Sequence, residues 1–183
     1  MKGVAILFAR SDSVYKGMEG CDVWDAGRDA RKWPGGCPVV AHPPCRAWGR
    51  LRHFAKPRLG EMGDAIWCVG KVRQWGGVLE HPSGSRLWQA AEMAEPGKVD
   101  GHGGWTMPVH QWWWGHRAAK STWLYIVGLG PAECPEIKLR IGYPSHVVQG
   151  RGGQPHITKA ERERTPEGFA QWLVELARRT GRV

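Results

Sequence analysis

Two apolar runs that each stop at a reactive side chain constrain the fold of this chain most strongly. A strand is expected over residues 38–42, shortly before Cys45, and a second over 77–80, which ends at Glu80. Between them, residues 64–75 carry apolar side chains at helical spacing, bounded by glycines. Strand, helix and strand in this order predict a βαβ unit with parallel strands and a right-handed crossover. Cys45 and Glu80 should then meet at one edge of the sheet, where α/β folds bind ligands.

The length and composition favour one α/β domain over residues 1–183, with a single mostly parallel sheet and flanking helices. At 183 residues and 42% hydrophobic content, the chain is long enough for one core and too short for two comfortable ones. The remaining elements are predicted from periodicity and turn residues. They are strands over 4–9, 21–24 and 122–127, a short helix over 88–93, a loop over 96–104, an irregular segment over 128–158 with one short strand near 146–148, and a C-terminal helix over about 165–179, capped by Thr165.

The cysteines and the hydropathy of the chain indicate in which compartment of the cell the protein is expected. The five cysteines include no Cys-x-x-Cys pair, so we expect reduced thiols and neither a disulfide scaffold nor a zinc ribbon. No metal is expected either, because no predicted helix carries two histidines at the spacing of metal ligands. The sequence shows no stretch of about eighteen apolar residues and no secretion signal, which favours a cytoplasmic protein.

The charge of the chain points to a polyanion as partner. The formal net charge is +9, and a basic surface on a small protein most simply serves nucleic acid. Arg46, Arg50 and Arg52 follow Cys45 directly, with Trp48 interleaved among them. Cations for phosphates and rings for stacking are the mixture that binding of single-stranded DNA or a flipped base requires. The alternative reading is a solvated basic loop.

A thiol paired with a carboxyl group suits chemistry on a pyrimidine ring. Carbon 5 of cytosine or uracil is a poor nucleophile until a thiolate adds to carbon 6, and the adduct can then attack a one-carbon donor. A carboxyl group against the ring nitrogen and exocyclic amine would stabilise the developing charge. Cys45 is therefore the candidate nucleophile, with a pKa that the following arginines could lower, and Glu80 is the candidate ring-binding acid.

At these residues the chain resembles the DNA cytosine-5 methyltransferase family, particularly the small single-domain members found in phage and prophage genomes. Pro44-Cys45 is similar to the family's Pro-Cys motif, and Glu80-His81 is similar to its Glu-Asn motif, with His81 in place of the asparagine. The likeness extends over residues 38–128. It implies that Cys45 and Glu80 are catalytic. The substrate and DNA contacts that it implies are Pro44, Arg46, Arg50, Arg52, His81, Lys120 and Thr122.

The same resemblance implies S-adenosyl-L-methionine as the methyl donor. The residues that would hold it are Phe8, Ala9 and Arg10 at the end of the first strand, with Asp25 or Asp29 on a ribose hydroxyl. The segment after the first strand contains no glycine, so its backbone should not easily take the positive φ values of a tight cofactor loop. We therefore expect a shortened Rossmann-like methyltransferase fold with a degenerate cofactor region.

Two further functions remain open from the sequence. One is a pyrimidine nucleotide-modifying enzyme that keeps the cysteine addition and uses a different one-carbon donor. The other is a catalytically inactive phage DNA-binding protein, whose biological effect would survive the change Cys45→Ala. The short segment at 128–155, where the family places its target-recognition region, suggests weak sequence readout in every case.

Overall fold

The computed structural model describes residues 3–148 and 153–180. The strands are β1 (Val4–Ala9), β2 (Cys21–Asp25), β3 (Val39–Ala41), β4 (Gly77–Pro82), β5 (Gly104–His110) and β6 (Ser121–Val127). The helices are α1 (Glu61–Trp75), α2 (Leu87–Ala90), α3 (Lys159–Glu163) and α4 (Glu167–Arg179). Short 3-10 turns are η1 (Val14–Gly17), η2 (Ala30–Lys32), η3 (Arg52–Phe54), η4 (Gln111–Trp114) and η5 (Pro131–Glu133).

All six strands form one sheet in the order β2-β1-β3-β4-β6-β5. The first four are parallel, and β6 runs antiparallel between β4 and β5. The expectation of a mostly parallel α/β sheet is confirmed. The order reverses at β1, because β2 lies on one side of it and β3 on the other. The carboxyl ends of β1 to β5 and the start of β6 therefore share one edge, and this reversal is where open α/β sheets bind ligands.

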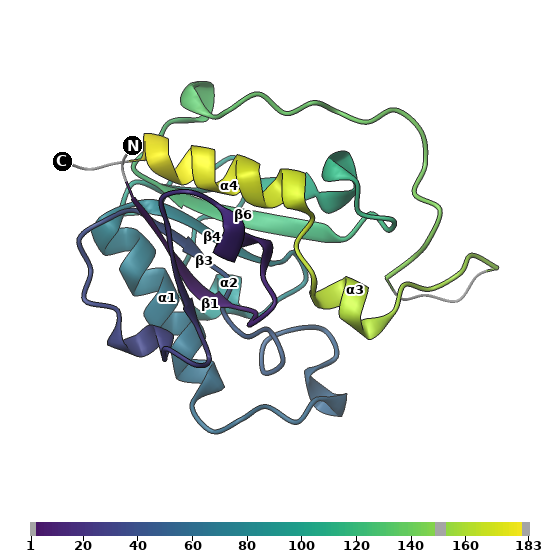
Figure 1. The fold of residues 1–183 in the computed structure, drawn as a ribbon, viewed down its shortest axis with the longest axis horizontal. Helices are drawn as coiled ribbons and strands as arrows, with labels where there is room; N and C mark the ends of the chain where they lie inside the picture. Colours follow the sequence, from purple (N-terminus) through teal and green to yellow (C-terminus); the bar gives the residue numbers. More distant parts are fainter. Residues whose placement is uncertain (1–2, 149–152, 181–183) are drawn as a thin grey trace.

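Helices cover both faces of the sheet, so the molecule has three layers (Figure 1). Side chains alternate along each strand: Leu7 packs with the α1 core and its neighbour Ile6 with the α4 core. Helix α1 begins and ends beside glycines, as predicted, and buries Val69 and Val72. Ile66, expected on that buried face, is 40% exposed. Alternation thus divides the apolar residues between two cores on opposite sides of one sheet.

Helix α4 is confirmed with the buried face predicted from its periodicity. Phe169, Trp172 and Leu173 lie in the core beneath it. The N-cap lies one residue later than expected, because Pro166 has an extended backbone and takes this position in place of Thr165.

Three local predictions were wrong or incomplete. Strand β5 was not predicted, because Pro108 in its middle is unfavourable for a central strand. β5 is the outermost strand of the sheet, where proline is tolerated. The strand expected near 146–148 is absent, since only isolated bridges form at His146 and Val147. The helix expected over 88–93 is the four-residue α2. No helix within the described residues is long and apolar enough to cross a membrane.

Candidate functional site

The sheet edge brings the two predicted catalytic residues together. Cys45 follows β3, Glu80 lies near the end of β4, and these two strands pair in parallel register. Lys120 reaches the same edge from the opposite direction, because it immediately precedes the antiparallel strand β6. Cys45 is exposed, whereas the Glu80 side chain is only 14% exposed. The prediction that parallel strands would place the thiol and the carboxylate at one edge is confirmed.

Two side chains, His42 and Gln111, hold Glu80, and each of them is held by a further side chain. His42 Nδ1 lies 3.1 Å from Glu80 Oε2, and Gln111 Nε2 donates to Glu80 Oε1 at 3.0 Å. His42 is in turn fixed by the buried Tyr15, whose hydroxyl lies 2.9 Å from His42 Nε2. Thr122 accepts a second hydrogen bond from Gln111 Nε2 at 3.1 Å. Each carboxylate oxygen has two acceptor positions, so one on each oxygen remains for a ligand.

These contacts keep Glu80 ionised. Burial by itself would raise the pKa of its carboxyl group, but the hydrogen bond from His42 and the nearby charges of Lys120 and the histidines lower it to about 2. In the free protein Glu80 is therefore a carboxylate at neutral pH. It is suited to accept hydrogen bonds from a ring N–H and an exocyclic amine, and less suited to donate a proton itself.

The ionisation of the Cys45 thiol differs from the expectation. The pKa of its thiol is raised, first by desolvation and then by the negative charge of Glu80, while Lys120 acts in the lowering direction. The neighbouring Arg46 does not activate the thiol as proposed, because its guanidinium pairs with the buried carboxylate of Glu61. In the free protein Cys45 is thus mainly a thiol at neutral pH.

Lys120 faces this pair from the start of β6. Burial lowers the pKa of its ammonium group, and the negative charge of Glu80 offsets only part of this effect, so the pKa stays below its ordinary value. Its Nζ also donates to the backbone carbonyl of Arg164 at 3.2 Å, and its backbone has a positive φ of 42°. A strained non-glycine backbone of this kind is commonly found at functional sites. Lys120 is therefore placed to respond to any change of charge on either partner.

Two residues expected to contact substrate or DNA are buried instead. Thr122 is 1% exposed and supports Gln111 from behind, so its part in the site is indirect. His81 is also 1% exposed and packs against Trp88, with the two ring centroids 6.3 Å apart. Burial lowers the pKa of His81 to about 4, and neither of its ring nitrogens has a partner among the described residues. A direct DNA contact from either side chain does not fit this burial.

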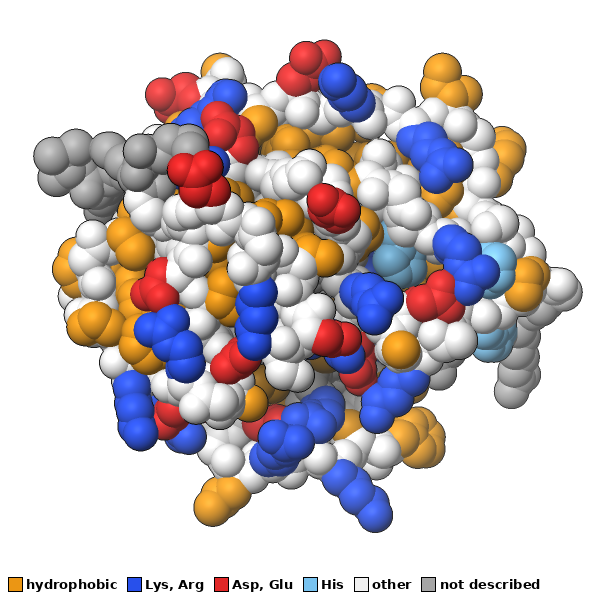
Figure 2. Space-filling model, viewed as in Figure 1, with side chains coloured by type: hydrophobic (Ala, Val, Ile, Leu, Met, Phe, Trp, Pro, Cys, Tyr) orange, Lys and Arg blue, Asp and Glu red, His pale blue; other side chains and the backbone are white. Residues whose placement is uncertain are grey.

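The basic residues after Cys45 differ in whether a carboxylate pairs with them. Arg46 Nε donates to Glu61 at 3.1 Å, which neutralises it. Arg50 is exposed and Arg52 is half-buried, and no carboxylate within residues 3–148 or 153–180 pairs with either. Pro44 is half-buried at the turn. Lys and Arg side chains gather along the lower rim in Figure 2, where Figure 1 places the loop before α1.

The residues proposed to bind the cofactor lie along the same edge, beyond β1 and β2. Phe8 takes a φ of 58° at a bulge in β1, and its ring meets the edge of Trp67. The argument that a segment without glycine avoids positive φ is therefore wrong at this position. Ala9 is buried, and Arg10 forms ion pairs with Asp12 and Glu163 at 2.8 and 2.9 Å. A turn after β1 exists: the Ser13 amide donates to the Arg10 carbonyl at 3.1 Å, and the Arg10–Asp12 ion pair spans the same residues.

The carboxylates of Asp25 and Asp29 both already have partners within the protein. Asp25 is 8% exposed, accepts the backbone N–H of Gly27 at 2.9 Å, and pairs with Lys16 at 2.7 Å. The side chain of Lys16 is 48% exposed. Asp29 caps η2 by accepting the backbone N–H of Arg31. A ribose hydroxyl at Asp25 would share Oδ2 with the ammonium group of Lys16.

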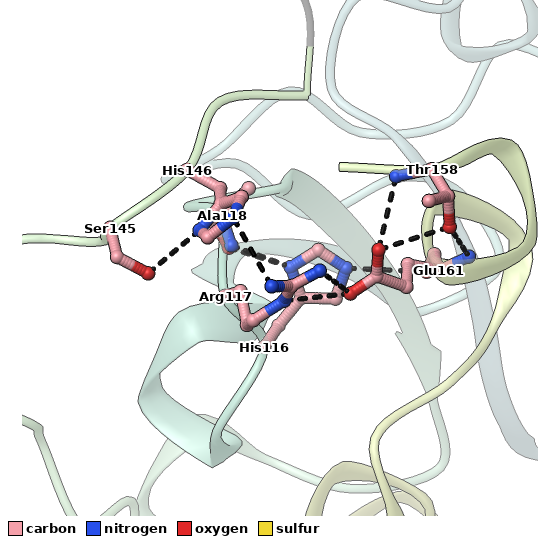
Figure 3. Close-up of polar contacts among 7 residues, drawn as sticks. All are labelled: His116, Arg117, Ala118, Ser145, His146, Thr158 and Glu161. Carbon is pink, nitrogen blue, oxygen red and sulfur yellow. Dashed lines mark hydrogen bonds and ion pairs between the residues drawn. The ribbon is translucent and has the colours of Figure 1, made fainter. Parts of the chain in front are cut away.

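A short segment that contains α3, residues 157–164, lies against the site through polar contacts and is called the strap below. Arg117 Nε donates to Glu161 at 2.7 Å, and Arg117 also contacts His146 at 3.1 Å (Figure 3). The strap reaches the site itself through the bonds of Glu163 to Arg10 and of the Arg164 carbonyl to Lys120. No residue of α3 is buried. Charge pairs rather than apolar packing hold α3 in place.

Sequence reasoning missed the residues that orient Glu80. His42 stands directly at the end of a predicted strand, so its place beside Glu80 could have been inferred from the parallel register. Gln111 could not have been found, because it follows β5, which the sequence did not predict. Comparisons with protein-family models, with curated proteins and with solved structures found no match to this chain.

The low pKa of Glu80 predicts a specific pH dependence of stability. Its folded-state pKa of about 2 lies below the ordinary value of 4.5, so ionised Glu80 favours the folded state above pH 4.5. This contribution is lost as the pH falls from 4.5 towards 2. We expect the stability difference between the wild type and Glu80→Gln to shrink across this window in urea unfolding. Glu136→Gln, which alters an exposed carboxylate, is the matched control. An equal narrowing for both variants would contradict the assignment.

Proposed function

We propose that this protein is a DNA base-modifying enzyme, similar to a cytosine-5 methyltransferase, in which Cys45 adds to carbon 6 of cytosine and Glu80 binds the ring. The observation that carries the proposal is the placement of an exposed thiol and an ionised, doubly oriented carboxylate on adjacent parallel strands. The net charge of +9 supports DNA as the substrate, as do Arg50 and Arg52, which no carboxylate of the described residues pairs with. In a duplex, the target base would have to be flipped out of the stack.

Binding of the base itself would activate the nucleophile. Glu80 raises the pKa of the Cys45 thiol, so a hydrogen bond from the cytosine amine to Glu80, and a proton shared between Glu80 and the ring nitrogen, would remove part of that effect. Neutral cytosine has no hydrogen on this ring nitrogen, so the proton comes from the thiol as it becomes the thiolate, and it returns to Cys45 when the carbon–sulfur bond breaks. The thiolate forms the bond to carbon 6, and carbon 5 then takes the methyl group from its donor. Loss of the carbon 5 proton to solvent at the open edge and cleavage of the carbon–sulfur bond regenerate Cys45.

S-adenosylmethionine is the proposed donor, bound beyond β1 and β2 by Phe8, Ala9, Arg10 and Asp25. The reversal of strand order at β1 supports this place for it. In this proposal the sheet is a shortened Rossmann-like methyltransferase fold, and methyl transfer proceeds from the β1 side of the edge towards Cys45. Asp25 is favoured over Asp29 for the ribose hydroxyls, because it lies at the end of β2 itself.

Calorimetric titration with S-adenosylmethionine and its demethylated product tests the donor. We expect binding in the micromolar range for the wild type, weakened at least about tenfold in Asp25→Asn. Asp22→Asn is the matched control, because Asp22 lies on the same strand with its side chain 48% exposed. Absence of binding at millimolar ligand would refute this donor for the isolated chain. Equal weakening in both variants would refute the role given to Asp25.

One observation favours a second candidate, a DNA-binding protein without methyl transfer. Lys16 already neutralises Asp25, and Glu163 already occupies Arg10, so the side chains offered to a cofactor are engaged within the chain. Under this alternative, DNA binding persists while the titration shows no donor binding, and Cys45→Ala leaves the biological effect intact.

A further inference from the structure

A hollow of about 490 Å³ adjoins the candidate site, between the turn after Cys45 and helix α2. Its lining includes Trp48, Arg52, Met62 and Arg86. The two sides are joined by their backbones: the Trp48 amide donates to the Cys45 carbonyl at 3.1 Å, and the Arg86 amide donates to the Trp48 carbonyl at 3.0 Å. The hollow is therefore attached both to the loop of the nucleophile and to the turn that follows β4.

The ionisable groups that line this hollow are both cations. No carboxylate in the described part of the chain pairs with Arg52 or Arg86. Glu61, next to Met62 in the sequence, is already engaged by Arg46. Two guanidinium groups without counter-charges favour a phosphate, because their planar forks match its oxygens and stay protonated.

The rest of the lining is mostly apolar. The Trp48 ring is 7% exposed and its indole N–H, also buried, has no acceptor among the described residues, so packing alone fixes the ring. Met62 is 57% exposed, which adds an apolar surface beside the two arginines. Arg50 packs against Gly84, two residues before Arg86, because a Cβ added at Gly84 would meet Arg50 Cδ at 2.8 Å. Apolar surface beside cations suits the sugar of a nucleotide, whereas the buried Trp48 ring supports the wall of the hollow and offers no face for stacking.

We propose that this hollow binds a phosphate group of the nucleic-acid strand that carries the target base, held between Arg52 and Arg86. The inference rests on the proposed function, in that the strand is the one whose base reaches Cys45. A phosphate fixed here would set the register of the strand relative to Glu80 and Cys45, which is the role that backbone contacts have in nucleic-acid recognition. The same chemistry would accept the phosphate of a free nucleotide, and the experiment separates these two sources.

Fluorescence anisotropy of a labelled single-stranded oligonucleotide, measured at several salt concentrations, tests the proposal. We expect Arg52→Gln and Arg86→Gln each to weaken binding about five- to twentyfold and to reduce the slope of log K against log salt by about 0.7, the value for one lost phosphate contact. Lys138→Gln is the charge-matched control, on an exposed residue of the loop after η5. It should leave the slope unchanged. Arg86→Lys, which keeps the charge, should retain most of the affinity.

Competition with deoxycytidine monophosphate separates the two sources of phosphate. Displacement of the oligonucleotide by the monophosphate in the wild type, and not in Arg86→Gln, would assign the hollow to a nucleotide. Displacement only by a dinucleotide or longer strand would assign it to the DNA backbone. Equal losses in Arg86→Gln and Lys138→Gln would overturn the proposal. Because the assay measures binding alone, absence of methyl transfer with an intact arginine effect would reject the enzyme and retain the phosphate site.

Discussion

Replacing Cys45 with serine should reduce methyl transfer to cytosine in DNA by at least about a thousandfold while leaving DNA affinity unchanged. A serine hydroxyl keeps the size and exposure of the side chain but is a far weaker nucleophile towards carbon 6. The Glu80 network contains no contact from the thiol, so the fold should not change. The direct measurement is a covalent complex with an oligonucleotide that contains 5-fluorocytosine, resolved on a denaturing gel, since fluorine cannot leave carbon 5 as a proton does.

The control for this change is another free thiol away from the site. Cys134 lies after η5, half-buried, with its Sγ 3.9 Å from the Gly130 carbonyl oxygen. Cys134→Ser should retain both the covalent complex and full activity. A covalent complex that persists in Cys45→Ser and disappears in Cys134→Ser would assign the nucleophile elsewhere and remove the basis of the proposed mechanism.

The sequence predicted the convergence of Cys45 and Glu80 because that convergence depends on one βαβ unit alone. Two apolar runs with a helix between them must form parallel strands, and parallel strands end at the same edge. The partners of Glu80 depend on longer-range pairing. Gln111 reaches the site because β5 pairs with β6, and β5 contains a proline and follows a glycine-rich loop, which are features of a turn rather than a strand.

Burial was harder to predict than position. Glu80 and His81 are neighbours in a strand, so their side chains must point to opposite faces of the sheet. Only one of them can face the Cys45 edge with Gln111, and the structure assigns that place to Glu80 and packs His81 against Trp88. Strand alternation would have revealed this from the sequence, whereas the family motif treats the two residues as a unit. A motif match therefore identifies residues without determining which face each one occupies.

Gly77→Ala should destabilise the fold by at least about 3 kcal/mol, because Gly77 stands where β3 and β4 approach most closely. Its φ is 120°, and a Cβ added there would lie 2.6 Å from the Val39 amide nitrogen and closer still to the Val39 carbonyl oxygen. Both atoms belong to the backbone of β3, so no side chain can move aside. The matched control is Gly70→Ala in α1, where an added Cβ meets nothing within 4 Å. Gly70→Ala should stabilise the protein by about 0.5–1 kcal/mol through helix propensity.

The substitution Gly77→Ala should also change the geometry of the site. The pairing of Val39 with Gly77 begins the register that ends with Cys45 and Glu80 at one edge, so a shift of β4 away from β3 separates the two reactive groups. Urea unfolding of both glycine variants, together with the covalent-complex assay, measures the two effects on the same samples. We expect Gly77→Ala to lose stability and complex formation together, and Gly70→Ala to retain both. Unchanged unfolding midpoints in Gly77→Ala would contradict the close approach of β3 and β4, and with it the geometry on which the proposed chemistry depends.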